Sequence, residues 1–295
     1  MSLLPKLEKI FAEYNLRPVK FRGQNFLVDE EVLDEIILAA DIKPSDTVLE
    51  IGPGLGFLTE RLISRAKKVI AVELDAQLFK ILQEKFSGAE NLELVNQDIL
   101  KFDFNFRFNN PSSPPLTLRG GARVPPLDAR GGGGSYKIVA NIPYEITTPI
   151  LQKFLTCVYP PAEIILMVQK EVARRTISET KRSLLTIFVN LYGAPEIAAA
   201  VPREAFYPVP KVASAILRII VKNPDKIQRE LNEKALKIAK IGFSHPRKKL
   251  LGNLAAGAGC DKDELIQIFQ KAGLNIDVRA ENLRPEEWLT LAEAI

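Results

Sequence analysis

The sequence contains few of the side chains on which metal sites and covalent catalysis depend. Its 295 residues include a single histidine, His245, and two widely separated cysteines, Cys157 and Cys260. This set is too small to build a zinc site, a Cys/His nucleophile pair or a disulfide framework. No apolar run reaches the roughly 18 residues that span a membrane, and the N-terminus lacks the pattern of a signal peptide. We therefore expect a cytoplasmic enzyme or binding protein that uses no metal.

A large excess of charge of one sign is also missing. Lys and Arg number 40 against 36 Asp and Glu, which gives a net charge of +4 at pH 7. Residues 105–135 contribute four arginines and one aspartate to that total, so the rest of the chain is nearly neutral. The same segment holds five prolines and six glycines, a composition that cannot bury a core and predicts a flexible insertion. Any nucleic-acid surface must therefore be sought in local clusters of cations.

Short apolar runs alternate with helical patterns along much of the chain. We expect strands at 47–51, 69–72, 92–95, 137–140 and 164–168. Helices are expected between several of them, at 55–65, 76–86 and 148–158. This alternation predicts a doubly wound, mostly parallel sheet. Residues 189–192 and 213–221, with fewer helix signals between them, are expected to add an antiparallel edge.

The strand signal ends near Asn223, and the length of the chain suggests two domains. Helices are expected beyond that point at 231–241, 262–272 and 285–294, the last with Pro285 in its first turn. We therefore predict a large α/β domain over residues 1–222, and a small all-helical domain over residues 223–295.

A glycine-rich turn joins the first predicted strand of the sheet to a helix. Residues 50–56 read Glu-Ile-Gly-Pro-Gly-Leu-Gly, with glycines at 52, 54 and 56. Glycine lets the backbone approach a ligand closely, and the following helix offers free N–H groups. The spacing is G-x-G-x-G rather than the G-x-G-x-x-G of nicotinamide or flavin sites. It resembles the S-adenosylmethionine (SAM) loop of class I methyltransferases, although a glycine turn in any α/β protein gives a similar string.

Acidic residues follow the next two strands. Glu73 ends one strand, and a carboxylate there can accept both hydroxyls of a ribose. Asp98 follows the other strand, where it could accept an adenine amine; the alternative is a solvated loop acid. Asp75 is better explained as a helix N-cap. Because these strand ends meet at the carboxyl edge of an open sheet, Glu73 and Asp98 predict a nucleoside site in its crevice.

The fourth parallel strand ends in Asn141-Ile142-Pro143-Tyr144, and this string predicts chemistry on an adenine amine. The lone pair of that nitrogen is delocalised into the ring. The side-chain carbonyl of Asn141 and the backbone carbonyl of Ile142 could accept its two N–H bonds and direct the lone pair at a methyl donor. Pro143 stiffens the turn, and Tyr144 can stack on an extruded base. The alternative is an ordinary turn in which Asn adopts an unusual backbone angle.

Seven motifs occur in the order found in the rRNA adenine N,N-dimethyltransferases, and the chain resembles that family over almost its whole length apart from 105–135. The motifs begin at residues 24 (QNFL), 50 (EIGPGLG), 71 (AVELD), 96 (NQDIL), 141 (NIPY), 169 (QKEVARR) and 206 (FYPVPKV). The resemblance implies a Rossmann-like class I fold and a SAM-dependent enzyme that dimethylates adenines. It implies a pocket for the cofactor and the target lined by Gln24, Asn25, Leu27, Gly52, Gly54, Gly56, Glu73, Asp98, Ile99 and Asn141. Phe206 would be a second stacking face beside Tyr144, although a buried core aromatic is favoured without the resemblance.

The family has two main bacterial branches. One modifies two adjacent adenines in a hairpin near the 3′ end of small-subunit (16S) rRNA, and the other modifies one adenine of large-subunit rRNA and confers macrolide resistance. The string that follows NIPY, residues 145–151, resembles the small-subunit branch, as do QKEVARR and residues 242–254. Pro246 and residues 181–185 depart from the family pattern, which puts substrate positioning in doubt but not the reaction.

Two clusters of cations are candidates for contacts with RNA phosphates. Residues 234–249 contain six cations and no acid. The predicted RNA-binding residues are Arg174, Arg175, Lys181, Arg182, Lys234, Lys237, Lys240, Arg247, Lys248 and Lys249. A solvated helix face is the alternative. We expect a monomer that acts on rRNA within an immature 30S-type particle; a particle-binding assembly factor and a DNA adenine methyltransferase stay open as other functions.

Overall fold

The computed structural model describes residues 2–18, 24–102, 116–117, 123–124 and 136–295. Two short strands, β5 (Leu116–Thr117) and β6 (Arg123–Val124), pair with each other in antiparallel fashion. The rest of the insertion predicted at 105–135 lies outside the described residues. The fold that positions the candidate site is therefore built from the chain on either side of it.

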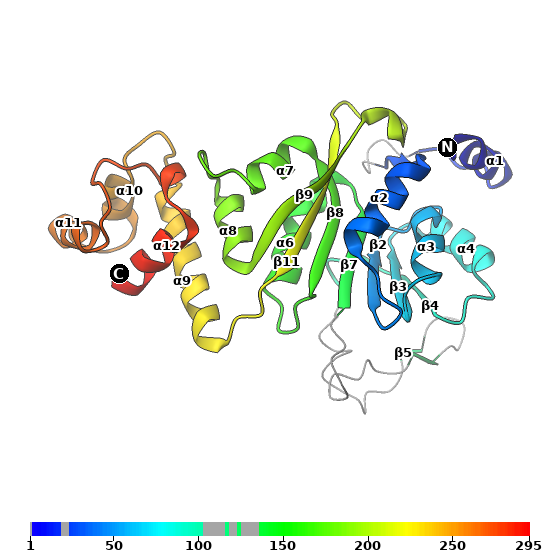
Figure 1. Cartoon of the computed structure of the whole chain (residues 1–295), viewed down its shortest axis with the longest axis horizontal. Coiled ribbons are helices and arrows are strands. Elements are labelled where there is room, and N and C mark those ends of the chain that lie inside the picture. Colours follow the sequence, from blue (N-terminus) through cyan, green and yellow to red (C-terminus); the bar gives the residue numbers. More distant parts are fainter. Residues whose placement is uncertain (1, 19–23, 103–115, 118–122, 125–135) are drawn as a thin grey trace. The chain divides into compact units, whose positions relative to one another are not determined.

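A central sheet in the described part of the chain has the strand order β4-β3-β2-β7-β8-β11-β9 (Figure 1). Its strands are β2 (Thr47–Ile51), β3 (Lys68–Glu73), β4 (Leu92–Asn96), β7 (Tyr136–Asn141), β8 (Glu163–Gln169), β9 (Gly193–Val201) and β11 (Ser214–Val221). The first five in spatial order run parallel, and β11 pairs antiparallel with β8. The doubly wound sheet and its antiparallel edge are thus confirmed, with every predicted parallel strand in place.

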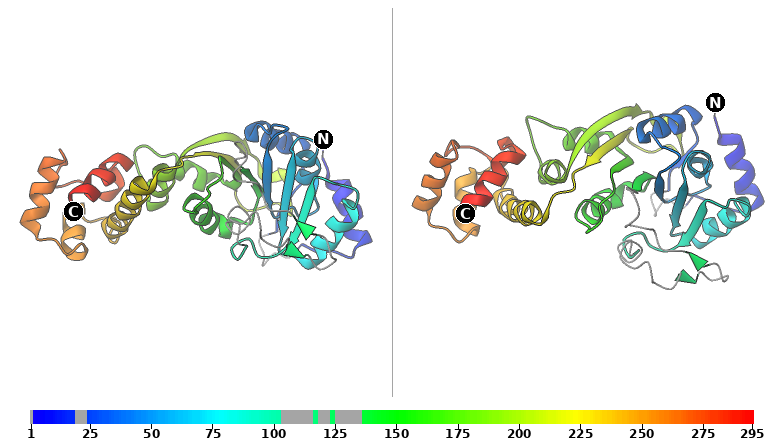
Figure 2. Two further views of the ribbon diagram at one scale, coloured as in Figure 1. Left: turned by 90° about the horizontal axis from the view of Figure 1, so that it is seen from below. Right: turned by 60° about the horizontal axis from the view of Figure 1, so that its bottom comes forward.

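Helices cover both faces of this sheet. They are α2 (Glu30–Ala40), α3 (Phe57–Ile63), α4 (Ala76–Lys85) and α6 (Thr147–Leu155), with α1 (Leu4–Glu13) at the N-terminus. Helix α2 begins at Asp29, whose carboxylate accepts the backbone N–H groups of Glu31 and Val32. It packs on β7, β8 and β11, whereas α6 lies on the opposite face (Figures 1 and 2). The strands β2, β3, β7 and β8 are therefore buried along nearly their whole length, which explains their largely apolar sequences, whereas β4 at the edge of the sheet is only partly buried.

The chain divides into two compact units. The α/β unit comprises Met1–Lys170 and Glu196–Val221, and the helical unit comprises Glu171–Pro195 and Lys222–Ile295. The helical unit contains α7 (Lys170–Thr176), α8 (Leu184–Tyr192), α9 (Lys226–Gly242), α10 (Leu250–Gly257), α11 (Lys262–Lys271) and α12 (Pro285–Ala294). The boundary expected after residue 222 lies next to the observed boundary, where the chain passes from the α/β unit to the helical unit between Val221 and Lys222. The contribution of residues 171–195 to the helical unit was not predicted.

Residues 189–192 form part of helix α8, so the strand predicted there is wrong. Ser183 caps this helix: its hydroxyl accepts the backbone N–H of Thr186, whose side chain accepts the N–H of Ser183 in return. The helix buries most of its side chains, and a buried helix is apolar on most of its surface. The apolar residues at 189–192 therefore reflect burial and do not indicate a strand. The edge of the sheet is formed instead by β9, which begins at Gly193.

The core of the helical unit is centred on Trp288, which is fully buried on α12. Its ring stacks on Phe243 at a centroid distance of 5.8 Å. Gly242, at the end of α9, has no room for a side chain, because a Cβ there would lie 2.5 Å from the indole ring. This close approach allows α9 to pack tightly against α12. The predicted cations of α9 therefore lie on a helix whose position within the helical unit is fixed by packing.

Candidate active site

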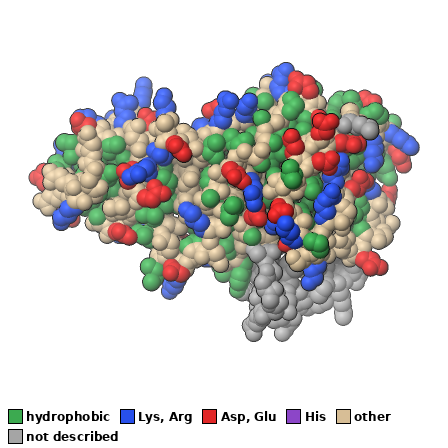
Figure 3. Space-filling model, viewed as in Figure 1, with side chains coloured by type: hydrophobic (Ala, Val, Ile, Leu, Met, Phe, Trp, Pro, Cys, Tyr) green, Lys and Arg blue, Asp and Glu red, His purple; other side chains and the backbone are tan. Residues whose placement is uncertain are grey.

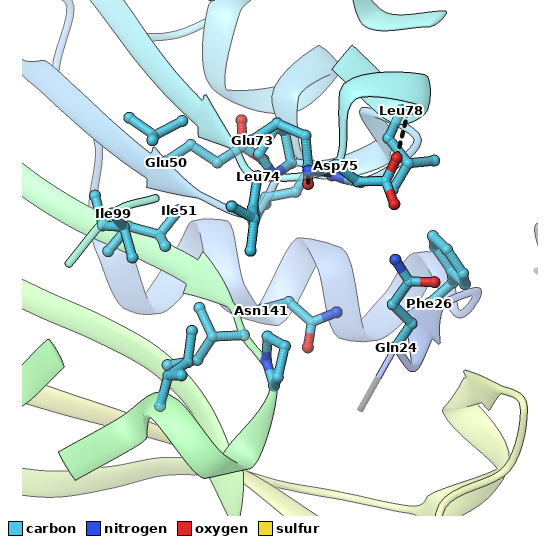
Figure 4. Close-up of a pocket in the computed structure, with 18 of the residues that line it drawn as sticks. Gln24, Phe26, Glu50, Ile51, Glu73, Leu74, Asp75, Leu78, Ile99 and Asn141 are labelled. Atoms are coloured by element: carbon cyan, nitrogen blue, oxygen red, sulfur yellow. Dashed lines mark hydrogen bonds between the residues drawn. The ribbon is translucent and has the colours of Figure 1, made fainter. Parts of the chain in front are cut away.

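A cavity of about 820 Å³ lies at the carboxyl ends of β2, β3, β4 and β7, within the α/β unit. It brings together the predicted residues Gln24, Asn25, Leu27, Gly52, Gly54, Glu73, Asp98, Ile99, Asn141, Ile142, Pro143 and Tyr144. Gly56 and Phe206 are not among the residues that line it. The cavity therefore joins the predicted cofactor residues to the predicted target residues in one continuous space (Figure 4).

The glycine loop forms one wall of the cavity. Gly52 and Gly54 have φ angles of +66° and +60°, in the left-handed region that side chains rarely adopt. A Cβ on Gly54 would meet the ring of Phe26 at 3.6 Å. Gly56 serves packing instead, because a Cβ there would lie 2.6 Å from the ring of Phe86. Two of the three glycines thus shape the ligand space, and the third allows the start of α3 to pack.

Glu73 is held rigidly at the end of β3. Its side chain is buried, and its two carboxylate oxygens accept the backbone N–H groups of Gly54, at 3.1 Å, and Asp75, at 2.8 Å. Burial raises the pKa of Glu73, while those two N–H donors act in the opposite direction. Each oxygen keeps a second lone pair, so the carboxylate can accept the two hydroxyls of a ribose without losing its own anchors.

Glu50, at the end of β2, is a second buried acid in the same cavity. Its side chain is only 1% exposed, and neither carboxyl oxygen has a hydrogen-bond partner among the described residues. Burial, with the nearby charge of Glu73, raises the pKa of Glu50 to about 8. A buried carboxyl without a partner fits a ligand that carries an ammonium group. No role was predicted for Glu50 from the sequence, although its position just before the glycine loop could have indicated a residue of the cofactor site.

Two aspartates near the cavity are held by turns. Asp75 caps α4 by accepting the N–H groups of Gln77 and Leu78, as predicted, and it also lines the cavity. Asp98 is half-buried, and one of its oxygens accepts the N–H of Leu100 at 2.9 Å. This bond orients the Asp98 carboxylate at the cavity wall, where its other oxygen can meet an adenine amine.

Asn141 lies across the open space from Glu73 and Leu74 (Figure 4). Its amide nitrogen donates to the backbone carbonyl of Asn25 at 3.3 Å. The amide is therefore oriented with its carbonyl oxygen as the end that remains for a ligand. Pro143 follows, and Tyr144 opens a 3₁₀ turn (η2, Tyr144–Ile146). Tyr144 lines the cavity, and its hydroxyl lies 2.7 Å from Oγ of Ser214.

Two motifs far apart in the sequence meet beside the cavity. Strand β1 (Phe26–Leu27) pairs with β10 (Phe206–Tyr207) in antiparallel register. Phe206 is 2% exposed and belongs to the hydrophobic core. Phe206 is not among the residues that line the cavity, and its partner in the register is Leu27, so the structure favours the alternative interpretation of Phe206 as a core aromatic over a second stacking face.

Further residues of the cavity were not singled out from the sequence. They include Phe26, Leu74, Gln97 and Leu100. Leu74 is 64% exposed, although it directly follows the buried Glu73. A large apolar side chain exposed at a cavity wall suits the face of an aromatic base. Its position after the acid that ends β3 was a signal that could have been used.

The predicted RNA-binding residues all belong to the helical unit. Those fully on the surface are Arg174, Arg175, Lys181, Lys234, Lys237, Lys240, Arg247, Lys248 and Lys249. Arg182 differs, because it is half-buried and its guanidinium donates to the carbonyl of Asn282. Lys249 is paired with Asp277 at 2.7 Å. On the face shown in Figure 3, Lys and Arg side chains gather at the upper left, over the region of α9 and α12.

The described residues contain neither a cluster of side chains suited to a metal ion nor a helix suited to a membrane span. Within that part of the chain, no three His, Cys, Asp or Glu side chains are grouped so that they could hold a metal ion. Among the same residues, no helix combines the length and the apolar character that crossing a bilayer requires.

The groups that line the cavity fit SAM. The carboxylate of Glu73 suits a ribose diol, that of Asp98 an adenine amine, and the orphaned carboxyl of Glu50 an ammonium group. The glycine loop keeps the wall between them free of side chains. The cofactor would therefore be held by acids from three successive strand ends.

Comparison with known proteins gives consistent matches over nearly the full chain. A family model described as ribosomal RNA adenine dimethylase matches residues 17–295. A protein of Dehalococcoides mccartyi named ribosomal RNA small subunit methyltransferase A is 41% identical over 291 residues, covering 98% of this chain and 92% of the relative. One of the same name from Moorella thermoacetica is 37% identical, covering 97% and 95%.

Solved structures agree with the fold. A dimethyladenosine transferase from Plasmodium falciparum is 27% identical with a TM-score of 0.72, covering 90% of this chain and 95% of that one. The 23S rRNA methyltransferase ErmE is 29% identical with a TM-score of 0.68, covering 92% and 99%. Both support the class I methyltransferase fold with its helical appendage. With sequence, fold and cavity in agreement, this chain belongs to the ribosomal RNA adenine dimethylase family.

Proposed function

We propose that this protein uses SAM to dimethylate the exocyclic amines of two adjacent adenosines in a hairpin near the 3′ end of small-subunit rRNA. The single observation that supports the proposal most is the shared cavity, in which Asn141 lies across from Glu73 and which Tyr144 also lines. The choice of the small subunit is supported by the names of relatives that are 34–41% identical. We also propose that the protein acts as a monomer on immature 30S-type particles in the cytoplasm.

The chemical problem is to make a poor nucleophile attack. The adenine amine is planar because its lone pair is delocalised into the ring. The carbonyl of Asn141 and the backbone carbonyl of Ile142 accept its two N–H bonds, and this favours a tetrahedral nitrogen whose lone pair is directed into the cavity. The bond from Asn141 to the carbonyl of Asn25 keeps the amide in the orientation that this role needs.

When bound, SAM supplies a methyl group on a positively charged sulfonium, which is already an activated donor. Asn141 and Ile142 therefore need to position the amine rather than deprotonate it, and the proton can leave to water after the transfer. Tyr144, which lines the cavity, would provide the ring face on which the extruded adenine stacks. The scarcity of histidine in the chain is consistent with a reaction that uses no general base.

The exposed cations of the helical unit support binding to the RNA backbone. Lys234, Lys237 and Lys240 lie on one side of α9 and are exposed to solvent. Contacts of this kind position an RNA without reading its sequence, so the choice of adenine would come from the shape of the hairpin and the fit of the base. Arg182 and Lys249 are weaker candidates, since each is already engaged within the protein.

A second candidate function is methylation of large-subunit rRNA. The observation in its favour is the 29% identity and full-length structural match to the 23S rRNA methyltransferase ErmE. The string at residues 145–151 and the higher identity to relatives named for the small subunit favour the first candidate.

Labelled methyl transfer from SAM separates these functions. The substrates are small-subunit particles from cells that lack the modification, and naked large-subunit rRNA, followed by digestion to nucleosides. We expect dimethyladenosine in the small-subunit particle alone. Label in the large-subunit RNA alone would support the second candidate. SAM binding with no transfer to either RNA would support an assembly factor that acts by binding.

A further inference from the structure

Ser214 is a fully buried polar residue that touches the predicted stacking residue. It is the first residue of β11, is 0% exposed, and pairs in the sheet register with Gln169, the last residue of β8. Its Oγ lies 2.7 Å from the hydroxyl of Tyr144. Both residues belong to the α/β unit, so the contact lies within one compact body.

We propose that Ser214 is a positioning residue that fixes the ring of Tyr144 in the orientation needed to stack on the target adenine. The proposal rests on the proposed function, because it assigns Ser214 a part in that reaction. Ser214 is not among the residues that line the cavity, so it would act only through Tyr144.

The geometry supports this role. The hydroxyl lies on the long axis of the tyrosine ring, so a hydrogen bond there fixes the direction of that axis and the place of the ring face. A phenol also prefers its partner near the plane of the ring, which limits rotation of the face. Tyr144 follows Pro143, whose φ of −54° is restrained, so the backbone holds the other end of the side chain. The ring is thus held at both ends.

The bond is well placed to remain formed. Ser214 lies on β11, which pairs with β8 along its length. The backbone of Ser214 is therefore held in the sheet, and this restricts the position of its Oγ. Burial raises the pKa of Tyr144, so its hydroxyl keeps its proton at neutral pH and can act as either donor or acceptor. A neutral bond of this kind contributes little to stability but leaves a buried hydroxyl unpaired when one partner is removed.

The test uses Ser214→Ala, Tyr144→Phe and the double variant in the full chain. Each single variant should lower kcat at saturating small-subunit particles about five- to tenfold and leave the dissociation constant for SAM unchanged. The double variant should be no slower than the slower single variant, because the two substitutions remove the same bond. Tyr136→Phe is the matched control: it removes a buried tyrosine hydroxyl, bonded to the carbonyl of Tyr159, at the other end of β7. Its kcat should equal that of the unchanged protein.

A readout that does not depend on catalysis comes from a hairpin RNA with 2-aminopurine at the target position. Stacking on Tyr144 should quench its fluorescence in the unchanged protein, and Ser214→Ala should reduce the quenching at saturating protein. A Ser214→Ala protein with unchanged kcat and quenching would overturn the proposal, as would additive losses in the double variant. If Ser214→Ala unfolds, Tyr144→Phe tests the same bond. Absence of methyl transfer by the unchanged protein would instead overturn the proposed function.

Discussion

In the α/β unit two acids of the site, Glu50 and Glu73, are buried, whereas in the helical unit most of the candidate functional charges lie on the surface. Glu73 is an example of the first kind: it lines the cavity, is buried, and its carboxylate accepts the backbone N–H groups of Gly54 and Asp75. Lys237 is an example of the second, exposed on α9. Buried charges need fixed partners and are hardly screened by salt, while exposed ones are strongly screened. On the proposed function, the α/β unit would recognise a small ligand by shape and fixed hydrogen bonds, and the helical unit would attract a polyanion through its electrostatic field.

The largest effect is expected in the α/β unit from Asn141→Ala. Loss of the carbonyl that accepts the amine N–H should lower the rate of methyl transfer about a thousandfold. Binding of small-subunit particles should stay unchanged, because it depends on the other unit. The rate is measured with labelled SAM under single-turnover conditions, and particle binding by filter retention. An equal loss of both would show that the two units do not divide the work in this way.

Glu73→Gln tests whether the buried charge serves the cofactor. It removes a charge-assisted acceptor of the ribose, so the dissociation constant for SAM, measured by calorimetry, should rise about thirtyfold. The matched control is Glu93→Gln, a buried acid on β4 that pairs with Lys68 and does not line the cavity. The control should lose stability but keep its affinity for SAM, and a similar loss of affinity in both variants would contradict the assignment of Glu73.

Replacement of three surface cations tests the other half of the comparison. Lys234, Lys237 and Lys240 changed together to Gln should weaken RNA binding about tenfold near 0.15 M salt. The slope of log affinity against log salt should become shallower by about two. Lys226→Gln, on the same helix but beside Glu230, is the control and should change neither value. Unaltered binding by the triple variant would support a merely solvated helix face.

The smallest effect concerns the pH dependence of folding. Because the pKa of Glu50 is raised to about 8 in the folded protein, the folded state keeps a proton that the unfolded state loses near pH 4.5. The folded state thus binds more protons between these values, so stability falls as pH rises through this window. Glu50→Gln should remove about 1 kcal/mol of the decline between pH 6 and pH 7. Urea unfolding measures it, and identical slopes in the two proteins would show that Glu50 is ionised in the fold.

The sequence predicted the parallel sheet well because four of its strands, β2, β3, β7 and β8, are buried along nearly their whole length and are therefore largely apolar. It failed at residues 189–192, where burial gives a helix the composition of a strand. The helices α1, α2 and α10 were not expected, although Asp29 before two glutamates is a readable N-terminal signal for α2. The contribution of residues 171–195 to the helical unit depends on packing between distant segments, which no local pattern records.

The site residues that follow from strand order could be predicted, and those that depend on tertiary packing could not. Glu73, Asp98 and Asn141 could be placed because parallel strands end at one edge of a sheet. The burial of Phe206 depends on the pairing of β10 with β1, which lies at the other end of the α/β unit's sequence. Glu50 was missed because its place before the glycine loop does not reveal that its carboxyl is buried without a partner, which is a property of three-dimensional packing.

The most direct test of this division of charge is the salt dependence of two affinities of the unchanged protein. SAM affinity is measured by calorimetry, and affinity for small-subunit particles by filter retention, over the same range of salt. We predict that SAM affinity is nearly constant, while log affinity for the particle falls with log salt at a slope of about −5. An affinity for the particle that does not change with salt, or an affinity for SAM that falls equally steeply, would contradict this division of charge between the two units.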